Sequence, residues 1–519
     1  MRSTTSFLET SDWAVIAVYL VGIIGLGVWF GRDQRNTRDY FLGSKTVPWW
    51  GVGLSIVAAE TSALTIIGVP SMAYGGNLLF IQMIIGYVLA RVILALVMVP
   101  HYFRGEIFSP YELFAHAFGP RARQTAGAMF LLSETLAAGV RVYVACIPIQ
   151  LMLGLKVLPA IGLFIGLSLV YTYIGGVKAV IWTDAAQFGL FVLGGLFTIV
   201  YIPVLIDGGW EATLQEAGAA GKLAWLRTHF DVFQSSGLSG FLRASLAEPF
   251  NIWMGLIGAT VMVMSSHGAE QLIVQRVLTC KNVADGRKAL ALSAVVIFPL
   301  FLVFLLAGAM LWVYYQHFPL AIPLPESRPG LKANDFIYPI FMLTAVPHVL
   351  RGFLIVAILS AAMSSVSSAL TSLASVSTMD FVRHMMRERT EEYYLRFSKY
   401  STVGWALALA LVAYLSREVL FVLNTAFSLR GLTSGALLGG LLLAVFWRQG
   451  RALPLIAGMA CSLVVMTTIQ TLPRLEGTKD LWRAWVGVEI FWPWYTLIGA
   501  TVTLLVAGLM RAALRDRSA

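Results

Sequence analysis

The chain has 519 residues, of which 58% are hydrophobic and only 12% are charged, and its mean hydropathy is +0.77. Soluble domains carry about 25% charged residues, so this composition excludes an ordinary soluble protein. The net charge of +10 and the three scattered cysteines indicate neither a nucleic-acid partner nor a disulfide framework, because the basic residues form no single clustered face and the cysteines are odd in number.

Thirteen apolar stretches are long enough to cross a lipid bilayer, which takes about 20 residues per helix. They predict an all-α polytopic membrane protein with about thirteen transmembrane helices and no separate soluble domain. The first stretch lacks a basic start and a small-residue cleavage site, which predicts a retained span. The stretches are 13–30, 52–74, 78–103, 124–153, 158–174, 179–206, 252–274, 289–315, 351–381, 401–415, 419–447, 453–471 and 491–509.

The loops between these spans differ in basic content. Loops after the odd-numbered spans, together with the C-terminus, hold 22 of the 37 Lys and Arg residues. Short basic loops stay in the cytoplasm. We therefore predict an N-terminus outside, a C-terminus inside and a multi-pass protein of the plasma membrane, which in a bacterium is the inner membrane.

The second and seventh spans carry polar residues and helix breakers at mid-segment. In the second span, "AAETSALTIIGVP" places Glu60, Ser62 and Thr65 at mid-segment. In the seventh span, "SSHGAEQ" places His267 and Glu270 at mid-segment. Unwound backbone at membrane depth must line a cavity or be buried in protein. Corresponding broken helices in two halves of a chain indicate a transporter's substrate site. Spans 2–6 and 7–11 would then be two repeats of five spans each. Because five is an odd number, the second repeat would cross the membrane in the opposite orientation to the first.

Charged residues lie inside several spans, where each costs about 2.5–3.5 kcal/mol on insertion scales. Glu134 and Arg141 are seven residues apart and share one helical face. We expect either that the two residues pair with each other, or that the planar guanidinium of Arg141 binds a substrate carboxylate.

The ninth span contains "AAMSSVSSALTS" at 361–372, a run of hydroxyls in an apolar stretch. On a helix, Ala361, Ser364, Ser365 and Ser368 share one face, which Ser367 adjoins. Two interpretations are open. Small residues let membrane helices approach closely, or the oxygens bind a hard cation such as Na+, helped by carbonyls freed at the break in span 2.

Four motifs resemble the sodium/solute symporter family, which includes sodium/glucose, proline, sialic acid, iodide and multivitamin symporters. They are "RDYFLGSKTVPWWGVGLSIVAAETSALTIIGVP" at 38–70, "YIGGVKAVIWTDAAQ" at 173–187, "QLIVQRVLTCKN" at 271–282 and "STMD" at 377–380. The resemblance implies one LeuT-type domain over 1–519. It comprises an extra helix and loop (1–50), inverted repeats (51–206 and 252–447) and two C-terminal helices (452–519).

The resemblance also implies sites for Na+ as the coupling ion and for the solute. The first sodium site consists of Ala58, Thr61, Ala361, Ser364 and Ser365. A second consists of Asp184, Ser364, Ser367 and Ser368, although Asp184 could instead cap or brace span 6. The substrate pocket consists of Glu60, Ser62, Thr65, Phe80, Gln82, Arg141, Glu270 and Gln271.

Together these features predict sodium-coupled uptake by alternating access, with two Na+ per cycle and a monomer as the functional unit. A buried acid and a buried Arg favour a carboxylate-bearing solute such as sialic acid or a monocarboxylate. The alternatives are symport of a sugar, polyol or amino acid with one Na+, and, with less support, a channel or a transport-derived sensor. An enzyme is not expected, because His267 has no partner motif such as HExxH.

Overall fold

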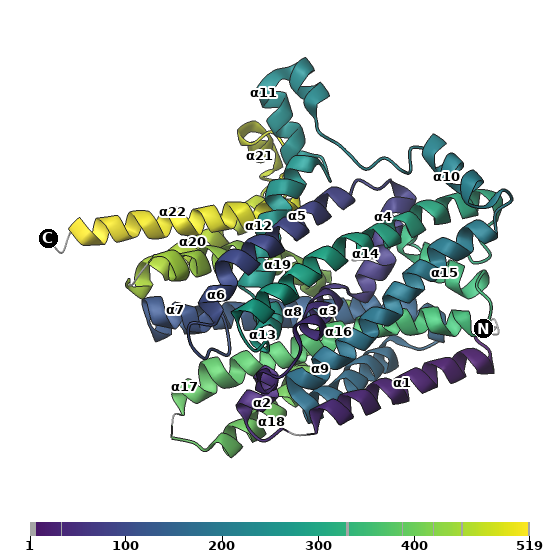
Figure 1. Ribbon diagram of the computed structural model, residues 1–519. Coiled ribbons are helices and arrows are strands. Elements are labelled where there is room, and N and C mark those ends of the chain that lie inside the picture. Colours follow the sequence, from purple (N-terminus) through teal and green to yellow (C-terminus); the bar gives the residue numbers. More distant parts are fainter. Residues whose placement is uncertain are drawn as a thin grey trace.

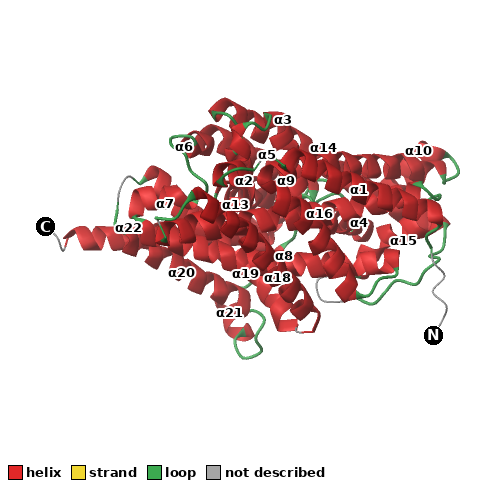
Figure 2. Ribbon diagram, turned by 90° about the horizontal axis from the view of Figure 1, so that it is seen from below, coloured by secondary structure: helices red, strands yellow, loops and turns green. Residues whose placement is uncertain are grey.

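The computed structural model describes residues 7–32, 34–327, 332–386, 388–418, 420–447 and 450–516. Within these residues the protein is all-helical and contains no strand (Figure 2). The predicted all-α class is therefore confirmed. The two ends of the chain lie at opposite ends of the helix bundle (Figure 1).

The helices follow one another without an intervening soluble domain. They are α1 (Thr10–Gly31), α2 (Thr37–Leu42), α3 (Trp49–Glu60), α4 (Ala63–Gly75), α5 (Ile81–Ile93), α6 (Val99–Tyr102), α7 (Tyr111–Phe118), α8 (Pro120–Leu153), α9 (Val157–Val204), α10 (Gly209–Ala219) and α11 (Phe230–Ala247). The second half contains α12 (Thr260–Gly268), α13 (Gln271–Leu278), α14 (Val283–His317), α15 (Ile337–Thr344), α16 (Leu350–Ser375), α17 (Arg383–Met385), α18 (Glu391–Glu418), α19 (Leu420–Phe446), α20 (Ala452–Thr471), α21 (Lys479–Trp485) and α22 (Tyr495–Asp516).

Eight helices of the described chain are long and apolar enough to cross a membrane, or nine when the bent pair α3 and α4 counts as one span. The number thirteen stays a prediction. One reason for the difference is α9, which joins the predicted spans 158–174 and 179–206 through a kink at Gly176. Gly176 has φ 54° and ψ −150°, and a Cβ there would lie 2.3 Å from the Tyr40 carbonyl oxygen. Only glycine fits this turn.

The predicted break in the second span is confirmed. Helices α3 and α4 are bent by 63° at Thr61 and Ser62. Ser62 begins α4 with a capping box, in which its side chain accepts from the backbone of Thr65 while the Thr65 hydroxyl accepts from the Ser62 amide at 3.3 Å. This reciprocal cap stabilises a new helix start at membrane depth.

The break in the seventh span is also confirmed. Helix α12 ends at Gly268 and α13 begins at Gln271, with Glu270 in an extended conformation between them. The Tyr102 hydroxyl donates to the Gly268 carbonyl oxygen at 2.5 Å, which satisfies one of the acceptors that the ended helix leaves open.

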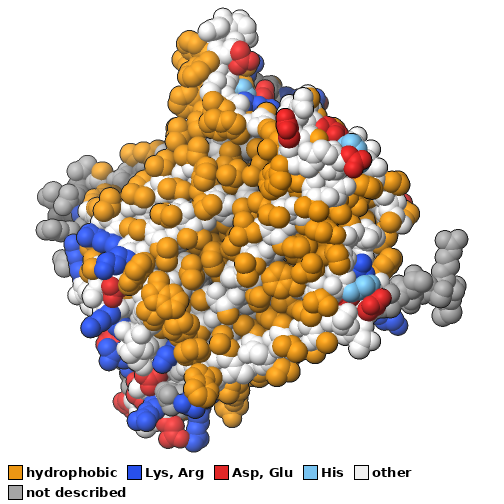
Figure 3. Space-filling model, turned by 45° about the vertical axis from the view of Figure 1, so that its right-hand side comes forward, with side chains coloured by type: hydrophobic (Ala, Val, Ile, Leu, Met, Phe, Trp, Pro, Cys, Tyr) orange, Lys and Arg blue, Asp and Glu red, His pale blue; other side chains and the backbone are white. Residues whose placement is uncertain are grey.

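The serine-rich helix α16 lies at the centre of the bundle, and every residue over 354–375 is buried. It packs against α1, α3, α4, α8, α9 and α18. Hydrophobic side chains cover the broad outer face of the molecule, and most charged groups in that view gather at its margins (Figure 3). The burial pattern therefore combines an apolar exterior with polar groups enclosed at the centre.

Candidate functional site

A cavity of about 790 Å³ extends beside both broken spans. Its described lining includes Glu60 from the first break, Glu270 from the second and Arg141 from α8. These three are sequence-predicted substrate residues, and the fold brings them to one space. The volume suits a small solute, since ligand pockets measure about 300–1,000 Å³.

One oxygen of the Glu60 carboxylate faces the side chains of Arg91 and His267. Arg91 donates from Nη2 to Oε2 of Glu60, and His267 Nε2 lies 3.5 Å from the same oxygen. Arg91 Nη2 also lies 3.0 Å from His267 Nε2. A guanidinium only donates, so Nε2 accepts and the imidazole proton sits on Nδ1, which donates to Ser266 Oγ at 2.9 Å. Contacts from described residues to the Glu60 carboxylate all use Oε2, which leaves Oε1 for the cavity.

Arg141 forms the ion pair that its spacing predicts. Its Nη2 donates to Oε1 of Glu134, and its Nε donates to the Ala137 carbonyl oxygen at 3.3 Å. The Glu134 side chain is 2% exposed and the Arg141 side chain 18% exposed. Arg141 therefore pairs with Glu134 and still faces the cavity, so the two sequence interpretations are compatible.

The remaining predicted substrate residues are placed outside the described lining of this cavity. Gln82 is buried, donates to the Phe250 carbonyl oxygen at 2.8 Å and accepts from the Arg227 amide at 3.0 Å, so it anchors the loop before α12. Phe80 packs edge-on against Phe250 with ring centroids 5.1 Å apart.

Gln271, Ser62 and Thr65 also have other surroundings. Gln271 donates from Nε2 to the Phe108 carbonyl oxygen at 2.7 Å and to Ser375 Oγ at 3.0 Å. Thr65 completes the helix cap described above, and Ser62 lines a second, smaller cavity. Near the breaks, polar side chains form hydrogen bonds with backbone groups. Side chains that are used in this way are not available to bind a ligand.

Several cavity residues come from the C-terminal helices and were not predicted. They include Gln470 and Arg474 near the end of α20, and Glu489, Tyr495 and Thr496 around the start of α22. In the sequence they lie at span ends, where polar residues are ordinary, so no pattern separates them from loop residues.

The predicted first sodium site lies where α3 breaks against α16. The Ser62 amide bonds to the Thr65 hydroxyl, so it is not donated to the Ala58 carbonyl, as a continuous helix would require. The Thr61 hydroxyl oxygen is buried and has no hydrogen-bond partner among the described residues. An unused carbonyl and an orphaned hydroxyl at this point fit a hard cation that takes oxygen ligands.

A cavity of about 10 Å³ lies beside this break, with room for roughly one water-sized particle. Ser62 and Ser365 line it from opposite elements, and Arg141 lines it as well. Ser365 donates to the Ala361 carbonyl oxygen at 3.1 Å, which leaves the hydroxyl lone pairs for an ion. Arg141 therefore borders both the large cavity and the ion-sized one.

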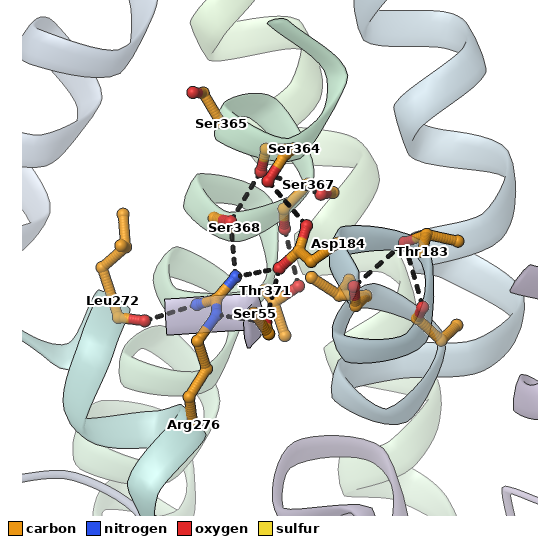
Figure 4. A network of polar contacts seen from close by, with 12 residues as sticks. Ser55, Thr183, Asp184, Leu272, Arg276, Ser364, Ser365, Ser367, Ser368 and Thr371 are labelled. Atoms are coloured by element: carbon orange, nitrogen blue, oxygen red, sulfur yellow. Dashed lines mark hydrogen bonds and ion pairs between the residues drawn. The ribbon is translucent and has the colours of Figure 1, made fainter. Parts of the chain in front are cut away.

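The residues of the predicted second sodium site surround an arginine in this structure (Figure 4). Arg276 on α13 donates from Nη2 to Asp184 Oδ2 at 2.9 Å and to Ser368 Oγ at 2.5 Å. Ser364 donates to Asp184 Oδ1 at 2.7 Å. Ser367 bonds to the Ser364 carbonyl oxygen at 3.0 Å. Two of the four predicted residues, Asp184 and Ser368, thus already bind a guanidinium, and the second sodium site stays a prediction.

Arg276 also connects α3 to this cluster. Its Nε donates to Ser55 Oγ at 2.9 Å, and Ser55 in turn donates to Asp184 Oδ2 at 2.7 Å. The sequence prediction missed Arg276 because the seventh span was ended at residue 274, whereas α13 continues to Leu278. The signal was present: Asp184 is a buried acid, and a buried acid requires a counter-charge.

Comparisons with known proteins agree with this architecture. A model of the sodium:solute symporter family matches residues 40–461. The chain is 27% identical to the sodium/sialic acid symporter SiaT of Proteus mirabilis, over 97% of this chain and 95% of that protein. It is 26% identical to the sodium/glucose cotransporter of Vibrio parahaemolyticus, over 90% and 86% of the two chains.

A human relative and a solved structure extend the comparison. Sodium-coupled monocarboxylate transporter 1 of Homo sapiens is 26% identical, over 89% of this chain and 74% of that protein. The substrate-bound outward-open state of a Na+-coupled sialic acid symporter superposes with a TM-score of 0.82 at 24% identity, covering 97% of this chain and 98% of that one, and shows the shared fold. The chain therefore belongs to the sodium:solute symporter family, whose matched members are sodium-coupled membrane transporters and not enzymes.

Proposed function

We propose that this sodium-coupled symporter takes up a small polar solute that carries a carboxylate and at least one hydrogen-bond donor. The observation that supports the proposal is the position of Arg141, which borders both the large cavity and the ion-sized cavity. A solute carboxylate at Arg141 lowers the local positive charge and so favours a cation beside Ser365. Solute and Na+ then bind cooperatively, as coupling requires.

The second requirement comes from Glu60. Glu60 lines the cavity, and its carboxylate oxygens only accept hydrogen bonds, so Oε1, which no described residue contacts, suits a hydroxyl or an ammonium group. A hydroxylated acid and a zwitterion both satisfy Arg141 and Glu60, whereas a neutral sugar leaves Arg141 without a substrate anion. Relatives named for sialic acid and for monocarboxylates place acidic solutes within the family. Sialic acid or a monocarboxylate-like hydroxy acid is our first candidate, and an amino acid is the second.

For the ions, we propose Na+ at Ala58, Thr61, Ala361, Ser364 and Ser365. A second Na+ at Asp184, Ser364, Ser367 and Ser368 enters only when Arg276 leaves Asp184 and Ser368. One ion crossing 100 mV down a tenfold gradient supplies about 3.7 kcal/mol, enough for roughly 500-fold accumulation. A second ion doubles that energy, and an anionic solute returns part of the electrical term.

The remaining architecture is proposed on the same basis. Two inverted five-helix repeats (51–206 and 252–447) follow the extra helix of 1–50 and precede the helices of 452–519, with the N-terminus outside and the monomer as the working unit. Support comes from the paired breaks and from the opposite positions of the two termini (Figure 1). Alternating access then occurs through movement of α3, α4, α12 and α13 around the central site.

The deciding experiment is uptake into proteoliposomes. A thermal-shift panel of sugar acids, hydroxy acids, amino acids and neutral sugars, each with and without Na+, selects the solute. Radiotracer uptake is then measured with an inward sodium gradient and with choline in its place. We expect sodium-dependent uptake of a carboxylated solute; sodium-dependent uptake of neutral sugars only would contradict the proposed solute class.

The ion pair between Arg141 and Glu134 predicts opposite changes in solute affinity for two variants. Arg141→Ala is expected to weaken binding of the carboxylated solute by about 100-fold, since a charged hydrogen bond contributes about 1.5–3 kcal/mol. Glu134→Gln is expected to strengthen binding severalfold, because Glu134 competes with the solute for the guanidinium. Isothermal titration at saturating Na+ measures both. Equal affinities in all three proteins would remove Arg141 from the site.

Glu60→Gln tests the donor requirement. It keeps the size of the side chain and replaces a charged acceptor by a neutral amide beside Arg91 and His267. We expect affinity for the hydroxylated or zwitterionic solute to fall by at least tenfold, while the analogue that lacks the hydroxyl or amine binds both proteins equally. An equal loss for the two ligands would show that Glu60 only maintains the fold.

A further inference from the structure

A second kind of pocket lies at the end of the bundle where α22 finishes. It measures about 260 Å³ and lies between α7, α19, α20 and α22. This end of the molecule, at the left of Figure 1, holds the end of α22. It shares no lining residue with the cavity that Glu60 and Glu270 line.

The pocket combines apolar walls with two arginines. The apolar lining consists of Phe118, Leu443, Pro454, Leu455, Ala507 and Leu514. Arg451 and Arg511 line the same space. No ion-pair partner for either guanidinium is found among the described residues. Two positive charges with no anionic partner among the described residues, beside an apolar wall, suit a ligand that has an anionic head and an apolar tail.

Arg511 is fixed in place without having its hydrogen bonds satisfied. Its guanidinium carbon lies 4.5 Å from the ring centroid of Trp447, a cation–π contact that holds the group in one orientation. Its Nη1 is buried and lacks a hydrogen-bond acceptor among the described residues. Buried donors in native proteins are paired with an acceptor, and an anionic oxygen supplies one here.

The local backbone adds to the preference for an anion. Arg451 is the N-cap of α20, so the free amides of the first turn of a 20-residue helix begin beside this pocket. Trp447 stands where α19 ends, a position typical of the membrane–water interface. The sequence predicts this end to be cytoplasmic, and basic pockets between membrane helices on that side bind lipid head groups.

We propose that this pocket binds an anionic phospholipid. Arg451 and Arg511 hold its phosphate, and the apolar wall formed by α19, α20 and α22 holds part of one acyl chain. A free phosphate shares the head-group chemistry but leaves the apolar wall without a ligand. The site would tie the two C-terminal helices to the cytoplasmic leaflet.

Native mass spectrometry of the full-length chain in detergent tests the proposal. Dioctanoyl-phosphatidylglycerol, dioctanoyl-phosphatidylcholine and glycerol 3-phosphate are added separately to the wild type and to Arg451→Ala/Arg511→Ala. We expect the double variant to need at least tenfold more phosphatidylglycerol for equal occupancy, with no difference for phosphatidylcholine and no retained glycerol phosphate. Arg121→Ala, which removes an exposed arginine from the start of α8, is the matched control and should bind as the wild type does.

Two outcomes would overturn the proposal. Equal phosphatidylglycerol binding by wild type and double variant would show that the arginines form no site. Retention of glycerol phosphate as strong as that of the lipid would make this a site for a free phosphate. An unchanged sodium-induced thermal shift shows that the double variant is folded; if it is not folded, Arg511→Gln replaces it in the same three measurements, with the same expected tenfold change.

Discussion

Ser365→Ala is expected to abolish sodium-driven uptake while leaving a folded protein. Ser365 lines the ion-sized cavity beside the break in α3, and its hydroxyl is one of the oxygens that we propose as Na+ ligands there. The substitution removes one of about five oxygen ligands, and its own hydrogen bond to the Ala361 carbonyl is local to the helix. The substitution is therefore expected to weaken ion binding more than it destabilises the fold.

The measurement has two parts. The sodium concentration for half-maximal thermal stabilisation should rise by more than tenfold, which corresponds to about 1.4 kcal/mol of lost binding free energy. Gradient-driven uptake should fall to the level seen with choline. Ser372→Ala is the matched control, since Ser372 is buried on the same helix, and its hydroxyl donates to the Ala369 carbonyl oxygen at 3.0 Å. A similar sodium affinity in the wild type and Ser365→Ala would place the ion elsewhere.

The sequence predicted the central features of this fold because their signals are local. Polar side chains in the middle of an apolar stretch are too costly to face lipid, so a break in the second span and another in the seventh could be predicted from the polar residues and helix breakers there, and the structure places them at Thr61 and Glu270. The spacing of Glu134 and Arg141 likewise made their pairing one of two expectations, because one helix carries both residues, and the pair is present in the structure.

Features that depend on contacts between distant elements could not be predicted in this way. Gln82 is polar and lies near the break, yet its amide is used by a loop about 145 residues further along the chain. Arg276 and Asp184 are 92 residues apart and meet only after α9 and α13 pack against α16. The cavity wall from α20 and α22 has no polar pattern of its own, and only the packing of the C-terminal helices places it beside Arg141.

Arg276→Ala is expected to produce a protein whose stability depends strongly on sodium. The substitution leaves Asp184 buried, and among the described residues only the Ser55 and Ser364 hydroxyls then donate to it. Removing one partner of a buried ion pair costs about 3–5 kcal/mol, a large part of the roughly 5–15 kcal/mol that stabilises a typical domain. The vacated space is bordered by Asp184, Ser364 and Ser368, so Na+ can replace the lost positive charge.

The stabilities of the two variants that break this ion pair are expected to depend differently on sodium. Arg276→Ala should unfold well below the wild type in choline chloride and recover most of that difference in sodium chloride. Asp184→Asn, which leaves the buried guanidinium without its anion, should be destabilised in both salts. Arg123→Ala is the matched control, because it removes the guanidinium partner of another buried aspartate, Asp380, and the resulting loss of stability should not respond to sodium. If Arg276→Ala responded to sodium no more than Arg123→Ala does, Asp184 would be a bracing residue, and the coupling ion would bind at the first site alone.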